Sequence, residues 1–256
     1  MNRKEEIGEL IGTFILVFIG CSSVAGAVLL DTFSSLLEVA FIWGIGITIA
    51  IYVAGKFGSA HLNPAVSLAI FIDNRISFKS LLQYTLFQII GAMLASILVY
   101  LIFEPSISTY ETQNQIVRGT SDSHVSAVMF GEFFPNPSFI NEIGELNWLS
   151  AMFLEAIGTF ILLMMIFIVS KKPSQYKLKV PVIIGLTVAI LIYFIAPYTQ
   201  AGLNPARDFG PRLIAYFSGW GTEAFPAAPF SFFTVYILGP YIGGFLAVKF
   251  KNLVKL

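Results

Sequence analysis

The tripeptide Asn-Pro-Ala occurs twice, as Asn63-Pro64-Ala65 and as Asn204-Pro205-Ala206, each time inside an apolar stretch. Asparagine is a natural helix N-cap and proline fits the first turn of a helix, so each tripeptide predicts a helix start. The free N–H groups of such a start and the asparagine amides can donate hydrogen bonds to a passing hydroxyl. The chemistry indicated is recognition of a small polar solute.

Each tripeptide follows a short segment that we expect to be extended. Backbone without helical hydrogen bonds is tolerated at membrane depth only where it is buried in protein or lines a wet cavity. The carbonyl oxygens of these segments would form a ladder of acceptors along one wall of a pore, opposite apolar side chains. The residues concerned are Ser59, Ala60, His61 and Leu62 in the first segment and Gln200, Ala201, Gly202 and Leu203 in the second.

Arg207 is the one charged residue that we expect to face this pore. It follows Asn204 by three residues, so helical spacing places both side chains on one face. A guanidinium at membrane depth is costly and is therefore a functional candidate. It can orient hydroxyl or carbonyl oxygens through its fixed donors, and its charge repels cations. Val66 is the matching position in the first half.

Three acidic residues are predicted to support the loops. Glu9 and Glu155 lie at equivalent places in two apolar segments, where each carboxylate could accept hydrogen bonds from N–H groups of its own half-loop. Asp208 could cap loop N–H groups or pair with Arg212. The alternative is that Glu9 or Glu155 binds a proton in a proton-coupled transporter of a small solute.

The composition is typical of a membrane protein. Apolar residues account for 56% of the chain and charged residues for 12%, against about 45–50% and about 25% in soluble domains. The net charge is zero, which gives no electrostatic reason to expect a nucleic acid partner. A single cysteine, Cys21, excludes an internal disulfide and a multi-thiolate metal site. No residue pattern predicts an enzyme, a metal or a cofactor.

Six segments have the roughly 20 mostly apolar residues that a membrane-crossing helix needs. They are residues 6–29, 36–55, 79–103, 148–170, 178–197 and 230–250. Shorter helices are expected at 63–72 and 204–217, and the first of these can cross only half of the hydrocarbon layer. The predicted fold class is an all-α membrane protein with six transmembrane helices and two re-entrant half-helices.

The two halves of the chain are similar in sequence. Residues 9–16 read Glu-Leu-Ile-Gly-Thr-Phe-Ile-Leu, and residues 155–162 read Glu-Ala-Ile-Gly-Thr-Phe-Ile-Leu. Each half holds three full spans, so the second enters the membrane with opposite polarity. We expect one channel domain over 1–256, with a first repeat at about 1–103, an external loop at about 104–147 and a second repeat at about 148–256. In this inverted three-plus-three arrangement, the amino ends of the half-helices meet near the middle of the membrane.

The placement of lysine and arginine predicts the orientation. The loop 104–147 contains six acidic residues and only Arg118 as a strong base. Most other basic residues fall on the opposite side, which predicts that both termini are cytoplasmic. Those residues are Arg3, Lys4, Lys56, Arg75, Lys79, Lys171, Lys172, Lys177, Lys179, Lys249, Lys251 and Lys255.

The sequences around the tripeptides resemble the aquaporin, or major intrinsic protein, family over nearly the whole chain. They read Ser-Ala-His-Leu-Asn63-Pro-Ala-Val and Gly-Leu-Asn204-Pro-Ala-Arg207. The aspartate after Arg207 is similar to the glycerol-facilitator branch, as are Ile42-Trp43-Gly44 and Phe134-Pro135-Asn136-Pro137 in the external loop. The resemblance implies a pore within each subunit of a homotetramer in the lipid bilayer, and its bacterial character favours the cell (inner) membrane.

The resemblance also assigns a four-residue selectivity filter. Trp43 and Arg207 match the family's tryptophan and arginine, and counting back from Asn204 gives Ala201 and Ile192 for the other two positions. Bacterial glycerol facilitators usually carry Phe and Gly at those two positions, so this filter looks more like that of nodulin-26-like plant channels. The implied function is a passive channel for glycerol, water and similar polyols that excludes ions and protons. A channel that prefers water, lactic acid or metalloid hydroxides stays open as an alternative.

Overall fold

The computed structural model describes residues 3–171, 179–226 and 230–256, and these residues form helices and no strand. Six of their helices are long and apolar enough to cross a membrane. They are α1 (Arg3–Leu30), α2 (Leu36–Ala54), α4 (Phe78–Gln113), α7 (Trp148–Ser170), α9 (Val180–Thr199) and Phe233–Leu253, which joins the π-helical turn η5 (Phe233–Leu238) to α11 (Gly239–Leu253). The predicted six-helix class is confirmed. Of the residues used to predict the orientation, Lys172 and Lys177 lie outside the described ranges.

Two short helices begin at the prolines of the tripeptides. α3 (Pro64–Ile72) and α10 (Pro205–Ala215) have Asn63 and Asn204 as their N-caps, both in extended conformation. The Asn63 side chain accepts a hydrogen bond from the N–H of Ala65, and that of Asn204 accepts from the N–H groups of Ala206 and Arg207. Asparagine caps and proline starts explain why both helices begin where they do.

The helix boundaries differ from the sequence expectation in two places. α4 continues to Gln113 although its apolar run ends at 103, and so the external loop is shorter than 104–147. Pro105 lies inside α4 and removes the backbone donor that would otherwise bind the carbonyl oxygen of Leu101. α10 ends at Ala215, where the π-helical turn η3 (Tyr216–Trp220) takes over. Short helices between α4 and α7 are α5 (His124–Ala127) and α6 (Ile140–Ile143).

Glycines bring the helices of each half into close contact. A Cβ at Gly91 of α4 would overlap the carbonyl oxygen of Leu10 in α1, and a Cβ at Gly243 of α11 would overlap that of Ala156 in α7. The two contacts occupy matching places in the two repeats. Between the repeats, α2 and α9 meet where Gly44 faces Gly185. The small residues allow the backbones to approach as they do in membrane helix pairs.

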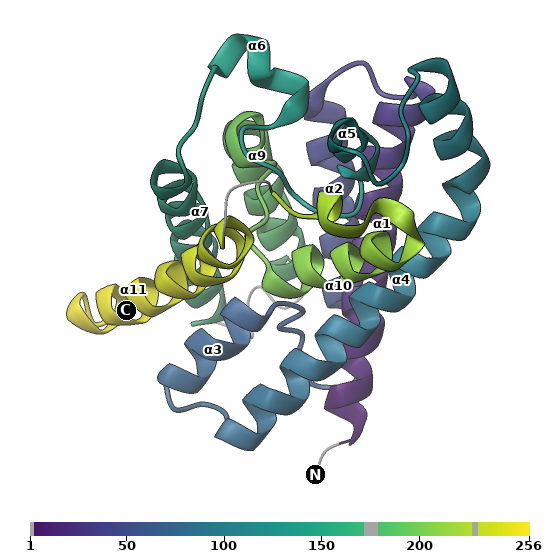
Figure 1. Ribbon diagram of the computed structural model, residues 1–256. Helices are drawn as coiled ribbons and strands as arrows, with labels where there is room; N and C mark the ends of the chain where they lie inside the picture. Colours follow the sequence, from purple (N-terminus) through teal and green to yellow (C-terminus); the bar gives the residue numbers. More distant parts are fainter. Residues whose placement is uncertain (1–2, 172–178, 227–229) are drawn as a thin grey trace.

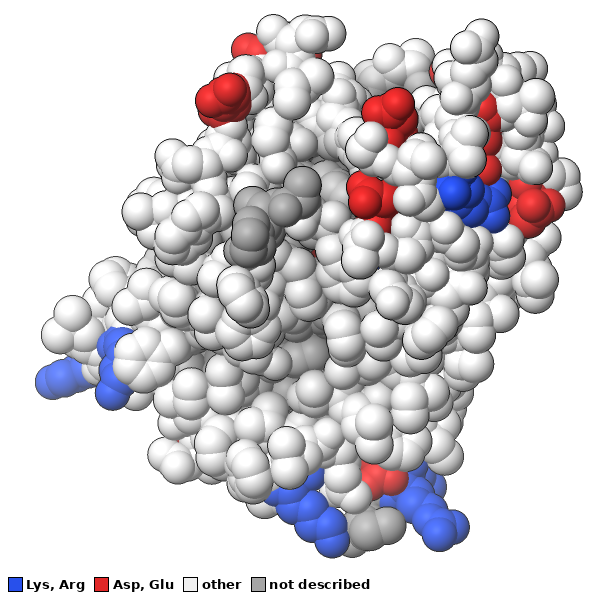
Figure 2. Space-filling view, viewed as in Figure 1, with Lys and Arg blue, Asp and Glu red and all other residues white. Residues whose placement is uncertain are grey.

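The surface has an apolar belt between two charged ends. Large apolar side chains such as Leu101, Phe194 and Ile190 are exposed along the outer faces of the long helices. Figure 2 shows lysine and arginine gathered mainly at one end of the molecule and most of the visible acidic residues at the other. In Figure 1 both termini lie toward the basic end, whereas α5 and α6 lie at the acidic end. This distribution suits a chain surrounded by lipid along its middle.

Candidate functional site

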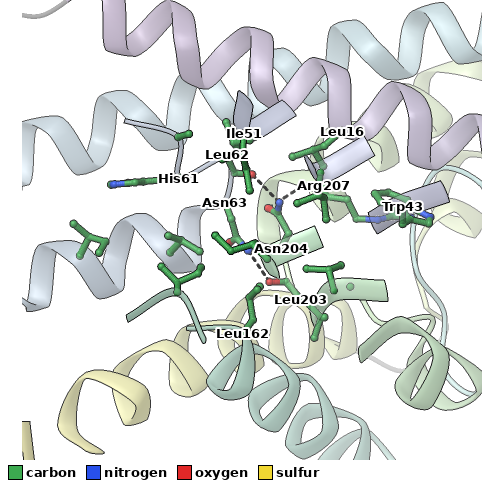
Figure 3. Close-up of a pocket in the computed structure, with 18 of the residues that line it drawn as sticks. Leu16, Trp43, Ile51, His61, Leu62, Asn63, Leu162, Leu203, Asn204 and Arg207 are labelled. Carbon is green, nitrogen blue, oxygen red and sulfur yellow. Dashed lines mark hydrogen bonds between the residues drawn. The ribbon is translucent and has the colours of Figure 1, made fainter. Parts of the chain in front are cut away.

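The amino ends of α3 and α10 are joined crosswise at the centre of the molecule. The Asn63 side-chain amide donates to the carbonyl oxygen of Leu203 at 2.9 Å, and that of Asn204 donates to the carbonyl oxygen of Leu62 at 2.8 Å (Figure 3). Each amide has two hydrogens, so one hydrogen of each remains for another acceptor. The two helix tips therefore converge, each capped by its own asparagine and tied to the other half of the chain.

Glu9 holds the segment that leads into α3. Its carboxylate is fully buried and accepts hydrogen bonds from the N–H groups of His61 at 2.8 Å and Leu62 at 2.7 Å. The side-chain amide of Gln88 in α4 donates to the same carboxylate at 2.7 Å. Charge-assisted bonds of this kind are the strong ones. They fix a stretch of backbone in which Leu62 adopts a positive φ of 55°.

Glu155 holds the segment that leads into α10 in the same way. Its buried carboxylate accepts from the N–H groups of Gly202 at 2.9 Å and Leu203 at 2.6 Å, and from the hydroxyl of Thr199 at 2.6 Å. Here too a leucine precedes the tripeptide with a positive φ, 52° at Leu203. The equivalent positions of the two glutamates thus correspond to equivalent contacts.

The carbonyl oxygens of these segments point the other way. In a trans peptide unit the N–H and the preceding C=O point in opposite directions. The N–H groups are directed at Glu9 and Glu155, so the preceding carbonyls are directed away from these carboxylates. They are the carbonyls of Ala60 and His61 in the first segment and of Ala201 and Gly202 in the second. The residues on that side line a cavity, so these oxygens form its polar wall.

Gly12 and Gly158 complete the repeated motif that begins at the glutamates. A Cβ at Gly12 would overlap the side chain of Leu62, and a Cβ at Gly158 would overlap that of Leu203. One helical turn after each glutamate, the glycine leaves room for the leucine whose N–H the glutamate binds. The shared spacing Glu-x-x-Gly is therefore explained by one local packing arrangement used twice.

An inner cavity of about 460 Å³ lies beside the joined amino ends of α3 and α10. Its wall includes Ile51 of α2, Leu162 of α7 and Val188 of α9 opposite the two backbone segments. One side offers carbonyl oxygens and asparagine amides, and the other offers aliphatic side chains. All eight residues of the predicted carbonyl ladder line it: Ser59, Ala60, His61, Leu62, Gln200, Ala201, Gly202 and Leu203.

A second cavity of about 350 Å³ includes Phe33, Tyr110 and Ser138 in its wall. Five residues line both cavities and therefore mark the place where the two meet. They are Trp43, Glu132, Ile192, Gln200 and Arg207. Of the four residues assigned to the filter, Trp43, Ile192 and Arg207 lie at this junction, while Ala201 lines the inner cavity.

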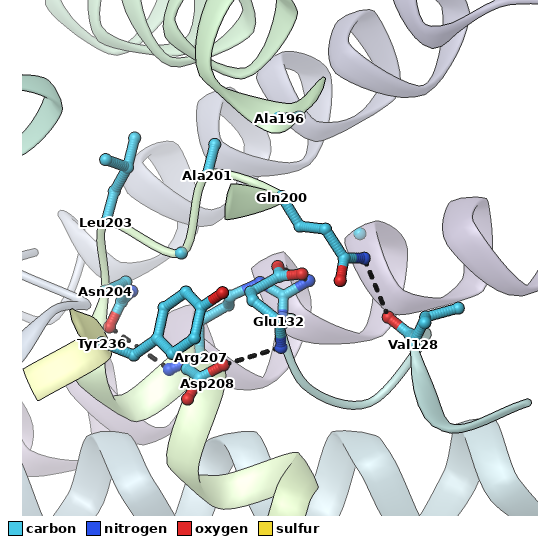
Figure 4. Close-up of polar contacts among 12 residues, drawn as sticks. Val128, Glu132, Ala196, Gln200, Ala201, Leu203, Asn204, Arg207, Asp208 and Tyr236 are labelled. Atoms are coloured by element: carbon cyan, nitrogen blue, oxygen red, sulfur yellow. Dashed lines mark hydrogen bonds and ion pairs between the residues drawn. The ribbon is translucent and has the colours of Figure 1, made fainter. Parts of the chain in front are cut away.

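The guanidinium of Arg207 lies between an indole and a carboxylate. Its Cζ is 4.6 Å from the centre of the Trp43 ring, a cation–π distance. Its Nη2 is 2.5 Å from Oε1 of Glu132, whereas Nη1 is buried and has no hydrogen-bond partner among the described residues. Figure 4 shows Glu132 beside Arg207 and Asp208, with Gln200 above them.

Asp208 links α10 to the external loop. Its carboxylate accepts from the backbone N–H of Glu132 at 2.8 Å and pairs with Arg212 one turn later at 2.8 Å. Both side chains of the pair are fully buried. Asp208 therefore both accepts from a loop N–H group and pairs with Arg212, the two contacts that the sequence suggested.

Sequence reasoning missed two residues of this site. Glu132, one of the acidic residues of 104–147, is buried and lines both cavities, so the expectation that Arg207 is the one charged residue facing the pore is wrong. Its setting in Met129-Phe130-Gly131-Glu132-Phe133 was the available signal, because an acid among aromatic residues is unusual on a solvated loop. Gly20 of α1 lies against Trp43, a contact between two helices that has no local sequence signature.

Comparisons with known proteins identify the family to which this fold belongs. The family model described as "Major intrinsic protein" matches residues 1–250. The chain belongs to the major intrinsic protein family. Together with the six apolar helices, this membership makes it an integral membrane protein.

Individual members of the major intrinsic protein family give a finer comparison. The chain is 33% identical over 243 residues to a glycerol uptake facilitator protein of Pseudomonas aeruginosa, which covers 94% of this chain and 84% of the relative. It is 34% identical over 249 residues to a propanediol uptake facilitator of Citrobacter freundii, covering 94% and 88%. The X-ray structure of the aquaglyceroporin from Plasmodium falciparum has a TM-score of 0.84 and 26% identity, covering 100% of this chain and 97% of that one.

Proposed function

We propose that this protein is a passive channel for small uncharged solutes, with glycerol as the main solute and water and similar polyols as others. The observation that carries the proposal is the inner cavity, in which hydrogen-bonding backbone faces an aliphatic wall. A polyol has hydroxyl groups along one edge and C–H groups along the other, so it matches both walls at once. The facilitators for glycerol and propanediol among the relatives support the same class of solute.

The exclusion of ions and protons belongs to the proposal. Each helix amino end carries roughly half a positive charge, and those of α3 and α10 converge on one lumen. This field disfavours cations and protons at the centre of the pathway, while neutral molecules pay no such cost. The channel needs no enzyme chemistry and no metal or cofactor.

The membrane setting is inferred from charge and family. The gathering of basic residues at the end with both termini supports cytoplasmic termini and an external α5–α6 segment. The relatives from bacteria support a cell (inner) membrane, and family resemblance supports a homotetramer with one pathway in each subunit.

Stopped-flow light scattering of proteoliposomes tests the function. Vesicles with the purified protein are mixed with a glycerol gradient and with a sucrose gradient, each with and without a pH gradient. We expect glycerol to enter with a low activation energy and without need of the pH gradient, and sucrose to stay out. Glycerol entry that requires the pH gradient would instead indicate the proton-coupled transporter, and water flow without glycerol entry would indicate a water channel.

A matched pair of variants on α9 tests the pathway. Val188 lines the inner cavity, whereas Ile190, two residues later, is 57% exposed on the outer face. Val188→Trp should block glycerol influx and Ile190→Trp should leave it unchanged. Equal fluxes in the two variants would mean that solute does not pass through this cavity.

A further inference from the structure

A carboxylate from the segment between α5 and the 3₁₀ turn η2 (Pro137–Phe139) reaches Arg207 at the junction of the two cavities. Glu132 lies in this segment, and its Oε1 is 2.5 Å from Nη2 of Arg207. The side chains are 3% and 4% exposed, and both residues line the inner and the outer cavity. The proposed solute pathway therefore contains one positive and one negative group at the same level.

The backbone of Glu132 is held on both sides. Its N–H donates to Asp208 at 2.8 Å, and its carbonyl oxygen accepts from Nη2 of Arg212. The preceding Gly131 has no room for a Cβ, which would overlap the Arg212 guanidinium. These contacts fix the backbone of Glu132 on α10 and so hold its side chain within reach of Arg207.

An unpaired guanidinium at this junction would favour one sign of ion. Its positive charge repels cations but attracts anions, and the attraction is strong where little water screens it. The neighbouring Ala201 is small and adds little steric obstruction to the inner cavity. Apolar walls alone would not reject a small anion that can bind the arginine.

We propose that Glu132 is a specificity-determining residue, whose carboxylate neutralises Arg207 at the junction and so makes the pathway reject anions as well as cations. The inference rests on the proposed function as a channel for neutral solutes. With the pair in place, Nη1 of Arg207 is buried and makes no hydrogen bond to the described residues. The pair thus leaves donors of the guanidinium unused while the junction loses its net charge.

The test is Glu132→Gln, which keeps the shape of the side chain and removes its charge. Chloride influx is followed in proteoliposomes with a chloride-quenched fluorophore, with potassium and valinomycin to balance charge, and glycerol influx is measured on the same vesicles. We expect chloride influx to rise about tenfold or more over wild type while glycerol influx is retained. Chloride influx at the wild-type level, with glycerol influx retained, overturns the proposal.

Two matched variants separate charge from structure. Glu142→Gln removes an exposed acid from the same loop and should leave chloride influx unchanged. Glu132→Asp keeps the charge and should keep chloride excluded. A chloride leak as large in Glu142→Gln as in Glu132→Gln contradicts a specific role for Glu132. Absence of glycerol influx in the wild type would count against the proposed function alone, since chloride is read separately.

A measurement on the unmodified protein gives a second test that no folding defect can obscure. Burial raises the pKa of Glu132 to about 8, although the nearby guanidinium lowers it in part, so wild type and Glu132→Gln are compared at a pH above this value. Its carboxylate is therefore protonated on acidification before exposed carboxylates are, and Arg207 then loses its counter-charge. Chloride influx should rise as the pH falls, and a flat profile down to the range of exposed carboxylates contradicts the proposal. Among the described residues, the other charged or titratable groups near Glu132 are Arg207, Asp208 and Arg212 of α10, Glu155 of α7, Tyr236 of η5, Cys21 of α1 and His124 of α5.

Discussion

Gly20 of α1 lies directly against the indole ring of Trp43 of α2, with no room for a methyl group between them. The same indole ring also lies over the guanidinium of Arg207, so its position affects the candidate site. The absence of a side chain at one position on α1 therefore sets where the aromatic wall of the junction can lie.

Gly20→Ala should displace Trp43 and narrow the junction. A Cβ at Gly20 would overlap the indole, and overpacking of this kind typically costs about 1–3 kcal/mol. We expect a lower midpoint of thermal unfolding and a several-fold lower glycerol influx in proteoliposomes. Ile7→Ala on the same helix is the control, since the Ile7 side chain is exposed on the outer surface. An unchanged glycerol influx in Gly20→Ala would show that Trp43 does not limit passage.

Glu155→Gln should damage the pore structure rather than uncouple transport from protons. Both carboxylate oxygens accept from N–H groups, so the amide of glutamine must direct its hydrogens at a backbone donor in either orientation. A buried donor left without an acceptor costs about 1–3 kcal/mol. We expect a lower thermal midpoint and a reduced glycerol influx that is still indifferent to a pH gradient.

One combination of results would contradict this structural role for Glu155. A Glu155→Gln protein with wild-type thermal stability, whose solute uptake had lost a dependence on the pH gradient, would assign Glu155 to proton binding. The thermal midpoint and the pH-gradient experiment are therefore measured on the same preparation.

The double variant Ala201→Phe with Ile192→Gly tests the filter residues. It enlarges one side chain and removes another near the junction of the cavities, so the shape of the opening changes more than its volume. We expect the ratio of glycerol to urea influx to change several-fold, since about 1 kcal/mol in a barrier is a factor of about five. A solute profile identical to wild type would remove Ile192 and Ala201 from the filter.

Asp208→Asn should be among the most destabilising single changes in α10. It leaves the fully buried guanidinium of Arg212 without its counter-charge, and breaking one partner of a buried pair typically costs about 3–5 kcal/mol. The expected result is a large drop in the thermal midpoint in detergent. Asp122→Asn, at an exposed position of the external loop, should leave the midpoint unchanged. Similar midpoints for the two variants would contradict the importance of the buried pair.

Much of the fold could be predicted from local sequence. Apolar runs predict long helices, and asparagine followed by proline predicts where α3 and α10 begin, because both signals depend on neighbouring residues. The repeated Glu-x-x-Gly motif also led correctly to equivalent places in the two halves. The predicted end of this helix at residue 103 was wrong, since a helix that extends beyond the lipid does not need an apolar sequence to continue.

The parts of the site that local sequence does not predict depend on distant contacts. Glu132 meets Arg207 only after the external loop has folded back onto α10, and Gly20 meets Trp43 only after α1 has packed on α2. A sequence pattern reports which residues are neighbours on one helix or strand. It does not report which loop side chain will enter a cavity built by other elements.

The crossed bonds of Asn63 and Asn204 also bear on how the molecule can move. Alternating-access carriers rock one repeat against the other about a central binding site. Here the asparagine of each repeat is hydrogen-bonded to the backbone of the other repeat at that centre, so rocking would break both hydrogen bonds at once. A chain whose two repeats are hydrogen-bonded to each other at the centre is suited to stay open to both sides. Its solute flux should rise in proportion to the solute gradient without saturating.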